Sequence, residues 1–439
     1  MNVKSKLRMI LVLFSVILII LAGCDGTTEI NSGSGSASSD AEEMDYSILP
    51  EIEMTDKKII ILGQEEGKAD VFEEHYGGEV ERIVVSDSEV FNRFMIMVMS
   101  DERIDVFENY MKPVLVTQGY LKSLDDYIDF SIPLWQDVKE INDLMQDKEG
   151  KHYTAVTSVQ RTMSLWYNKE IFEENGEPTP DTYLADGTWD WNKMREIALN
   201  LTIDVDSDGT NEVTGLCIDE VDGLLYSCGK HMVSFNGDGT ATNNILSPEV
   251  ARAVNFFVKL DTVDKVLYQQ GDGRTAFQQG KVAMITGGVW YRMLWPDMLG
   301  NDTAMFVPFP KDPDADKYYI QQGTAGYMIP STAGNVAAAC AFISSKRFEA
   351  DSLKYSSAYQ EYLDFMKEEY NWEQKHEDMF RNELNGPDKV GVPISYISFG
   401  VTDFYGDVFA RPSRGEPWAT IANEIAPKID EKIALAYGD

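Results

Sequence analysis

The sequence has few cysteines and histidines and no excess of positive charge. Among 439 residues there are four cysteines and four histidines, and the histidines share no short spacing. No HExxH motif, phosphate-binding glycine-rich loop or nucleophile elbow is present. The 38 Lys and Arg residues against 73 Asp and Glu give a net charge of -35, which disfavours binding to nucleic acid and to anionic lipid surfaces. The sequence therefore indicates no cofactor chemistry and no polyanionic partner.

Three of the cysteines are scattered through the body of the chain. Cys217, Cys228 and Cys340 lack the spacing of metal ligands. Because their number is odd, they give no disulfide framework, although a single bridge between Cys217 and Cys228 is the alternative. We expect buried free thiols without a chemical role.

A long apolar run occurs only at the N-terminus. Lys4, Lys6 and Arg8 precede the apolar run 9–21, and the tetrapeptide LAGC ends at Cys24. This pattern predicts a signal peptide over residues 1–23, because the apolar part is short for a transmembrane span. LAGC resembles the bacterial lipobox, in which the cysteine thiol takes a diacylglycerol and becomes the mature N-terminus. A plain signal peptide or an anchor helix is the alternative.

The next stretch, residues 24–55, is rich in serine, glycine and acidic residues, as in NSGSGSASSDAEE. It holds too few apolar residues to offset the entropy of ordering the chain. We expect a flexible tether that separates the folded body from the membrane.

The body of the chain is long enough to form two domains. Apolar runs at 57–63 and 80–85, and a third ending at Phe107, predict strands, and the periodic stretches 70–76 and 89–99 predict helices. This alternation is typical of an α/β fold with a mostly parallel sheet. Polar residues just past the carboxyl end of such a strand point toward the ligand crevice of an open sheet.

The stretch Phe277–Tyr291, FQQGKVAMITGGVWY, is the most informative local pattern. A glycine that ends a helix is followed by a buried strand over residues 282–285, a double glycine, and the adjacent aromatics Trp290 and Tyr291. The pattern predicts that the strand delivers these rings to a crevice. An ordinary strand-to-helix corner is the alternative.

Three motifs together carry a family resemblance. YNKEIFEENG at 167–176, TWDWNKMREIALNLT at 188–202 and FQQGKVAMITGGVW at 277–290 resemble the extracellular solute-binding proteins of carbohydrate ABC importers, to which maltose-binding protein belongs. The resemblance implies a two-lobed α/β fold, the type II periplasmic-binding-protein fold, with three hinge crossings. We place the crossings near 155–157, 285–287 and 327–330. The first lobe would then comprise residues 56–156 and 286–327, and the second lobe residues 157–285 and 328–439.

The resemblance also implies a sugar between two lobes that close on it. Aromatic rings would stack on the apolar faces of the sugar, while carboxylates and amides take its hydroxyls. The family motif places a stacking aromatic at Trp290, and polar contacts are expected just past the first crossing. Trp189 and Trp191 we interpret as packing residues. The predicted ligand-binding residues are Glu65, Glu66, Asn109, Gln160, Arg161, Trp166, Trp290, Tyr291 and Trp418.

An acidic stretch resembles part of a calcium loop. Asp204, Asp206 and Asp208 occupy positions 1, 3 and 5, the carbonyl of Thr210 position 7, and Glu212 position 9. Alternating oxygens on a tight turn suit a hard cation. Position 12 is a glycine where an EF-hand has a bidentate glutamate, so the site is incomplete, and a solvated acidic turn is the alternative. Any calcium would have a structural role, and no cofactor is required.

These observations favour a monomeric, lipid-anchored binding protein on the extracellular face of the cell membrane. It would capture a carbohydrate and deliver it to an ABC permease, without catalysis. A surface enzyme or adhesin acting on polysaccharide is the alternative, because a catalytic carboxylate pair is defined by its spatial separation and 73 acidic residues are available.

Overall fold

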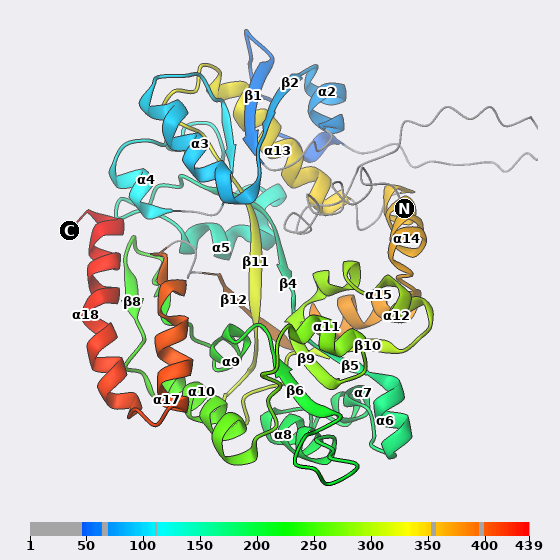
Figure 1. The fold of residues 1–439 in the computed structure, drawn as a ribbon. Coiled ribbons are helices and arrows are strands. Elements are labelled where there is room, and N and C mark those ends of the chain that lie inside the picture. Colours follow the sequence, from blue (N-terminus) through cyan, green and yellow to red (C-terminus); the bar gives the residue numbers. More distant parts are fainter. Residues whose placement is uncertain (1–45, 64–68, 110–111, 353–356, 395–398, 439) are drawn as a thin grey trace, which may run out of the picture. The chain divides into compact units, whose positions relative to one another are not determined.

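The computed structural model describes residues 46–63, 69–109, 112–352, 357–394 and 399–438. The chain divides into two compact units, and Figure 1 shows their elements in sequence colours. Unit 1 contains the described residues within 1–111, 118–158 and 325–364, and unit 2 those within 112–117, 159–324 and 365–439. The signal peptide, Cys24 and most of the tether lie outside the described residues.

Unit 1 is built on a sheet with the strand order β2-β1-β3-β11. Strand β1 (Lys58–Gly63) runs parallel to both β2 (Glu79–Val84) and β3 (Val106–Glu108). The end of β11 (Tyr318–Met328) pairs with β3 in the antiparallel sense, with Met328 opposite Phe107. The predicted parallel α/β core of the N-terminal part is confirmed, because each of the three predicted strands is present within two residues of its predicted place.

The helices of unit 1 pack apolar side chains against this sheet. Phe72 and Phe342 make an edge-to-face contact at 5.8 Å, and Phe94 stacks on Phe107 at 4.0 Å. The helical elements are η1 (Tyr46–Ile48), α2 (Asp70–Tyr76), α3 (Asp87–Met99), η2 (Pro133–Val138), α5 (Lys139–Leu144), α13 (Val336–Ser352) and the first part of α14 (Ser357–Tyr370).

The predicted tether is too long at its C-terminal end. Tyr46 lies 4.9 Å from the ring of His75, Leu49 is buried, and the carbonyl of Pro50 accepts a hydrogen bond of 2.6 Å from the Tyr76 hydroxyl. An aromatic residue and a leucine supply the apolar surface that the serine-rich part lacks. Residues 46–50 therefore belong to the folded body.

Unit 2 is built on a sheet with the strand order β10-β5-β9-β6. Strand β5 (Met163–Asn168) is antiparallel to both β9 (Val282–Gly288) and β10 (Ala304–Pro308), whereas β6 (Thr214–Ile218) is parallel to β9. All residues of β5, β9 and β10 are buried. A second pairing joins the first part of β11 to β12 (Lys389–Pro393) in the parallel sense, and β7 (Val233–Phe235) pairs with β8 (Ala241–Asn243).

The core of unit 2 contains both tryptophans predicted to pack. Trp189 and Trp191 are 3% and 2% exposed, and the indole N–H of Trp189 donates to the carbonyl of Pro308. The helical elements are α4 (Pro113–Thr117), α6 (Lys169–Asn175), α7 (Pro180–Ala185), α8 (Trp191–Asn200), α9 (Asp222–Ser227), α10 (Pro248–Val258), η3 (Lys259–Asp264), α11 (Gly273–Gln278), η4 (Val289–Met293), α12 (Pro296–Gly300), α15 (Gln374–Asp378), η5 (Met379–Leu384), η6 (Val401–Phe404), η7 (Gly406–Ala410), α17 (Arg411–Ser413) and α18 (Trp418–Tyr437).

The chain passes between the units inside three elements. The passages lie at 158/159 in β4 (Ala155–Arg161), at 324/325 in β11 and at 364/365 in α14, and the short segment 112–117 also belongs to unit 2. Two of the predicted crossings lie within a few residues of these positions. The predicted crossing at 285–287 is wrong, because β9 pairs with β5 up to Gly288. Residues 286–324 therefore belong to unit 2, and residues 328–364 to unit 1.

The prediction for the cysteines of the body is confirmed. Cys217, Cys228 and Cys340 are free and buried. Burial raises the pKa of Cys217 and of Cys340 to about 12, which keeps both thiols protonated and weakly nucleophilic at neutral pH.

Candidate functional site

The carboxyl ends of β6 and β9 lie side by side in unit 2. Ile218 at the end of β6 is opposite Thr286 in β9. Just past this pair, the Thr286 hydroxyl oxygen accepts a hydrogen bond of 3.3 Å from the backbone N–H of Glu220. Because parallel strands end at the same edge, the residues that follow them converge, and this edge is where open sheets bind ligands.

Two carboxyl groups lie at this edge, Asp222 buried and Glu220 partly buried. Burial raises the pKa of Glu220 to about 8, with the neighbouring charge of Asp222 adding to the shift and the backbone N–H of Gly288 opposing it. Burial also raises the pKa of Asp222 to about 6, and its carboxylate accepts a hydrogen bond of 3.2 Å from the Gln321 amide. A carboxyl with a pKa near 8 is largely protonated at neutral pH, so Glu220 can both donate and accept a hydrogen bond.

Arg274, from α11, joins the two strand ends. Its Nε donates to Asp219 Oδ2 at 2.6 Å. Its guanidinium lies 5.0 Å from the ring of Trp290 and 4.9 Å from the ring of Tyr291. The Tyr291 hydroxyl also donates to Asp219. The ion pair and the two cation–π contacts fix the half-buried Trp290 ring beside the carboxyls.

The double glycine explains why the aromatic rings fit. A Cβ on Gly288 would lie 2.3 Å from Cδ1 of Trp290, and a Cβ on Gly287 would lie 2.1 Å from Cε2 of Tyr291. Both distances are much shorter than a van der Waals contact. Only glycine at these two positions allows the rings to fold back against the end of the strand. We call the group Asp219, Glu220, Asp222, Arg274 and Trp290 the strand-end cluster.

Two of the predicted stacking residues are core residues. Trp166 is fully buried, with its indole N–H donating to the carbonyl of Gly288 and its ring 5.0 Å from Phe306. Tyr291 is also fully buried and makes an edge-to-face contact of 5.2 Å with Trp295. The prediction that these two rings stack on a ligand is wrong, because within unit 2 both faces are covered by protein. Tyr291 instead supports Asp219.

The other predicted contacts of unit 2 are spread over different elements. Gln160 and Arg161 end β4 and are half-buried. Burial lowers the pKa of Arg161, while Asp388 opposes this shift, and the buried Arg161 Nε has no hydrogen-bond partner in the described part of the chain. Trp418 is the half-buried first residue of α18. No hydrogen bond or ring contact within the described ranges joins these three side chains to the strand-end cluster.

In unit 1, the carboxyl ends of β1 and β3 form a comparable edge. Asn109 follows β3, is half-buried, and donates its backbone N–H to the carbonyl of Gly326 at 3.3 Å. A Cβ on Gly63 would lie 2.6 Å from Glu108 Oε2, so this glycine makes room for the Glu108 carboxyl. Burial raises the pKa of Glu108, and the charge of Arg82 opposes the shift. The predicted contacts Glu65 and Glu66 lie outside the described residues.

The acidic loop between α8 and β6 is a tight turn. Carboxylate oxygens of Asp204, Asp206 and Asp208 lie within 4.8 Å of one another. Asp204 accepts hydrogen bonds from the N–H groups of Asp208 and of Gly209, whose φ is 89°. Glu212 Oε2 accepts from the N–H of Val205 at 2.6 Å. Thr210 is exposed. Three clustered carboxylates match the oxygen donors that calcium prefers.

Asp219, Glu220 and Arg274 were not among the ligand-binding residues predicted from the sequence. Asp219 and Glu220 directly follow β6, and this is the signal that could have identified them. Arg274 carries no such signal, because it reaches the cluster from a helix whose position only the fold determines.

The family model of bacterial extracellular solute-binding proteins matches residues 58–344. The chain therefore belongs to this family, whose members are binding proteins found outside the cytoplasm. No curated protein matches the chain. In the described part of the chain, no helix combines the length and apolar character needed to cross a membrane.

Solved structures share the two-lobed α/β fold at low sequence identity. An ABC substrate-binding protein from Listeria monocytogenes in complex with cycloalternan is 19% identical, with a TM-score of 0.56, covering 86% of this chain and 99% of that one. The maltose/maltodextrin-binding domain from Bdellovibrio bacteriovorus bound to maltotriose is 18% identical, with a TM-score of 0.54 and coverages of 85% and 99%. UgpB from Mycobacterium tuberculosis in complex with glycerophosphocholine is 15% identical, with a TM-score of 0.58 and coverages of 87% and 98%.

Proposed function

We propose that this protein captures a sugar or oligosaccharide and delivers it to an ABC permease. The observation that carries the proposal is the half-buried Trp290 ring, held by Arg274 beside the carboxyls of Asp219 and Glu220. An aromatic face next to hydrogen-bonding carboxyls suits a ligand with an apolar ring face and many hydroxyls. The similar proteins in complex with cycloalternan and bound to maltotriose support this ligand class.

Glu220 is the group that we assign to a sugar hydroxyl. A carboxyl with a pKa of about 8 is neutral for much of the time at pH 7, so burying it against a neutral ligand costs less than burying a carboxylate. Asp219 is already paired with Arg274 and positions the guanidinium and the Trp290 ring. Gln160, Arg161, Trp418, Asn109, Glu65 and Glu66 are further proposed contacts.

We also propose that the mature protein is a monomer anchored by a lipid on Cys24, and that the acidic loop holds a structural calcium ion. The lipobox-like LAGC supports the anchor, and the clustered carboxylates of Asp204, Asp206 and Asp208 support calcium. Thr210, through its carbonyl, and Glu212 would complete the ligands.

A thermal-shift screen against mono- and oligosaccharides, with product analysis of every hit, tests the proposed function. A ligand that binds only the native state raises the melting temperature in a saturable manner. We expect stabilisation by at least one sugar without turnover. Products formed from the hit would favour the enzyme alternative, and no stabilisation by any sugar would contradict the proposal.

A further inference from the structure

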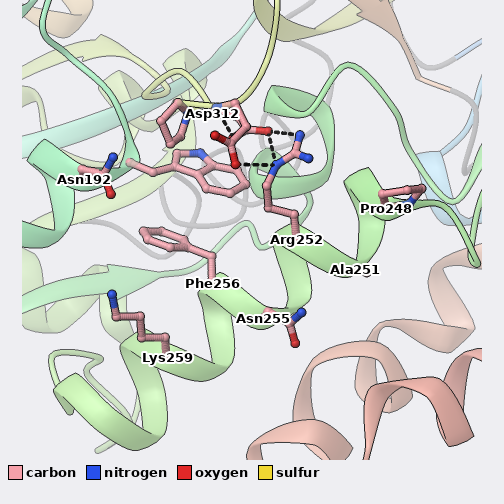
Figure 2. A pocket seen from close by; sticks show the side chains of 11 residues that line it. Asn192, Pro248, Ala251, Arg252, Asn255, Phe256, Lys259 and Asp312 are labelled. Atoms are coloured by element: carbon pink, nitrogen blue, oxygen red, sulfur yellow. Dashed lines mark hydrogen bonds and ion pairs between the residues drawn. The ribbon is translucent and has the colours of Figure 1, made fainter.

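A groove lies on unit 2 along one face of α10. It has a volume of about 590 Å³ and is bounded by α10, the start of α8 and the loop 312–314 (Figure 2). Pro248, Arg252 and Phe256 line it from α10, and Lys259 lines it from the start of η3. These positions share one helix face, because residues three or four apart are neighbours on a helix. The volume falls within the range of small-molecule sites.

The floor of the groove is aromatic. Trp191 stacks on Phe256 at 4.7 Å with an interplanar angle of 20°. Trp191 is 2% exposed, and its indole N–H donates to the Ser227 hydroxyl at 3.1 Å, which fixes the pair from below. Phe256 is only partly buried. A rigid aromatic surface that is partly open to solvent can hold the apolar face of a sugar ring.

The charges of the groove balance. Arg252 Nε donates to Oδ2 of the buried Asp312 at 2.8 Å, and Figure 2 shows Arg252 reaching from α10 to Asp312. Lys259 and Asp314 are exposed, and the positive charge of Lys259 offsets the negative charge of Asp314. In a chain with a net charge of -35, an anion would be repelled over long range. A neutral ligand therefore fits this groove better than an anionic one.

Polar groups are available at the rim. The amide of the exposed Asn192, at the start of α8, makes no hydrogen bond within the described residues, and the Lys259 ammonium is exposed. Both can donate to hydroxyls of a ligand lying on Phe256.

We propose that this groove is a second carbohydrate-binding site for a neutral oligosaccharide. The inference takes only its ligand class from the proposed function, since the groove shares none of its lining residues with the strand-end cluster. A second, weaker site would keep a long oligosaccharide or polysaccharide close to the protein while the strand-end cluster takes a shorter segment.

Fluorine NMR of the full chain labelled with 5-fluorotryptophan tests the proposal. The chain has eight tryptophans, and Trp191→Phe assigns the resonance of interest. Titration with maltotriose and maltoheptaose should shift the Trp191 resonance in a saturable manner with a millimolar dissociation constant. If neither probe shifts this resonance at up to about 50 mM, well above a millimolar dissociation constant, the proposal is wrong. A shift caused by a deca-proline peptide but by neither sugar would also overturn it.

Two variants and one control make the test specific. Phe256→Ala removes the aromatic surface, and Ala251→Arg fills the groove without changing the floor. Each should raise the dissociation constant measured at Trp191 by about tenfold or more, as expected for loss of an aromatic anchor. Val263→Arg adds the same charge at a site that is 70% exposed and outside the groove, and should leave binding unchanged. An equal change of this dissociation constant in Ala251→Arg and in Val263→Arg would contradict the groove assignment.

The failure of one site can be told from the failure of the other. The tighter binding phase is the sugar binding that we assign to the strand-end cluster. Trp290→Ala should weaken this phase and leave the sugar-induced shift of the Trp191 resonance intact. If sugars shift Trp191 but no tighter phase exists, the proposed function fails and the groove stands. If the tighter phase exists without a Trp191 response, the groove fails and the proposed function stands.

Discussion

At the scale of single residues, Trp166 and Trp290 show how the same side chain can lie in opposite environments. Trp166 is fully buried between Phe306 and Trp295, whereas Trp290 is half-buried under Arg274. Trp166 lies within β5, which pairs with β9 on one side and with β10 on the other, so the Trp166 ring is buried in the core. Trp290 lies in η4, two residues past Gly288 at the end of β9, and so extends past the sheet.

Replacing Trp290 with alanine should weaken sugar binding. Loss of a stacking anchor commonly costs about 2 kcal/mol or more, which is roughly a thirtyfold loss of affinity at ~1.4 kcal/mol per decade. Calorimetric titration with the sugar found by screening measures the loss.

Trp166→Ala is the contrasting variant. Because Trp166 is a core residue, its truncation should lower the free energy of unfolding by ~3–5 kcal/mol. A large drop in the melting temperature of Trp290→Ala with affinity preserved would show that Trp290 is a packing residue as well.

Glu220 should make stability depend on pH. Its pKa in the folded protein is about 8, above the ordinary value of 4.5. Between these values the folded state binds a proton that the unfolded state has lost, so this group lowers stability as pH rises through that window. Glu220→Gln should remove this loss and stabilise the protein at pH 8 by about 2 kcal/mol or more.

Denaturant unfolding at pH 5 and at pH 8 measures the Glu220 effect. Glu174→Gln removes one acidic side chain from the exposed surface of α6 and controls for the change in net charge. If wild-type and Glu220→Gln proteins lose the same stability between the two pH values, the assignment to Glu220 is wrong.

At the scale of elements, the pairing of β6 with β9 creates the strand-end cluster. The two strands are far apart in sequence, and β9 also pairs with β5. The motif from 277 to 290 predicted the strand and its aromatic end. The parallel neighbour that brings Asp219 and Glu220 to the same edge could not be read from that motif, because strand order is decided by packing of the whole unit.

The double glycine provides a test of this element. Gly288→Ala places a Cβ 2.3 Å from the Trp290 ring, so the ring must move, and we expect a loss of sugar affinity similar to that of Trp290→Ala. Gly406→Ala is a matched control, since a Cβ there meets nothing within 4 Å. Calorimetric titration measures the sugar affinity of both variants. Normal affinity in Gly288→Ala would show that sugar binding does not require this position of the Trp290 ring.

The acidic loop is a separate element with its own prediction. Asp206→Ala combined with Asp208→Ala should abolish any calcium-dependent rise in melting temperature, because it removes two of the three clustered carboxylates. Sugar affinity should stay nearly the same, since the loop precedes β6 and the cluster follows it. A wild-type melting temperature that does not change on chelation would show that the turn is only acidic and solvated.

At the scale of the whole molecule, the export and anchoring signals belong to residues outside the folded body. Cys24→Ser should move the protein from the membrane fraction to a soluble or unprocessed form, because a lipid on Cys24 is the proposed membrane anchor. Cell fractionation with immunoblotting measures this, and Cys340→Ser, which changes a buried thiol of the body, is the control. A processed Cys24→Ser protein that stays on the membrane would contradict the anchor.

The sequence by itself determined the local elements and the family. Strand and helix periodicity gave β1, β2, α2 and α3 within a few residues, and the three motifs indicated a solute-binding protein. These features depend on interactions between residues close in sequence, which a pattern records directly.

The tertiary structure alone decided which segments share a unit and which side chains meet. Residues 286–324 belong to unit 2 because β9 and β10 pair with β5. Arg274 joins Asp219 and Trp290 across more than fifty residues of sequence on one side and sixteen on the other. Such contacts are fixed by strand pairing and burial between distant segments, and no local pattern records them.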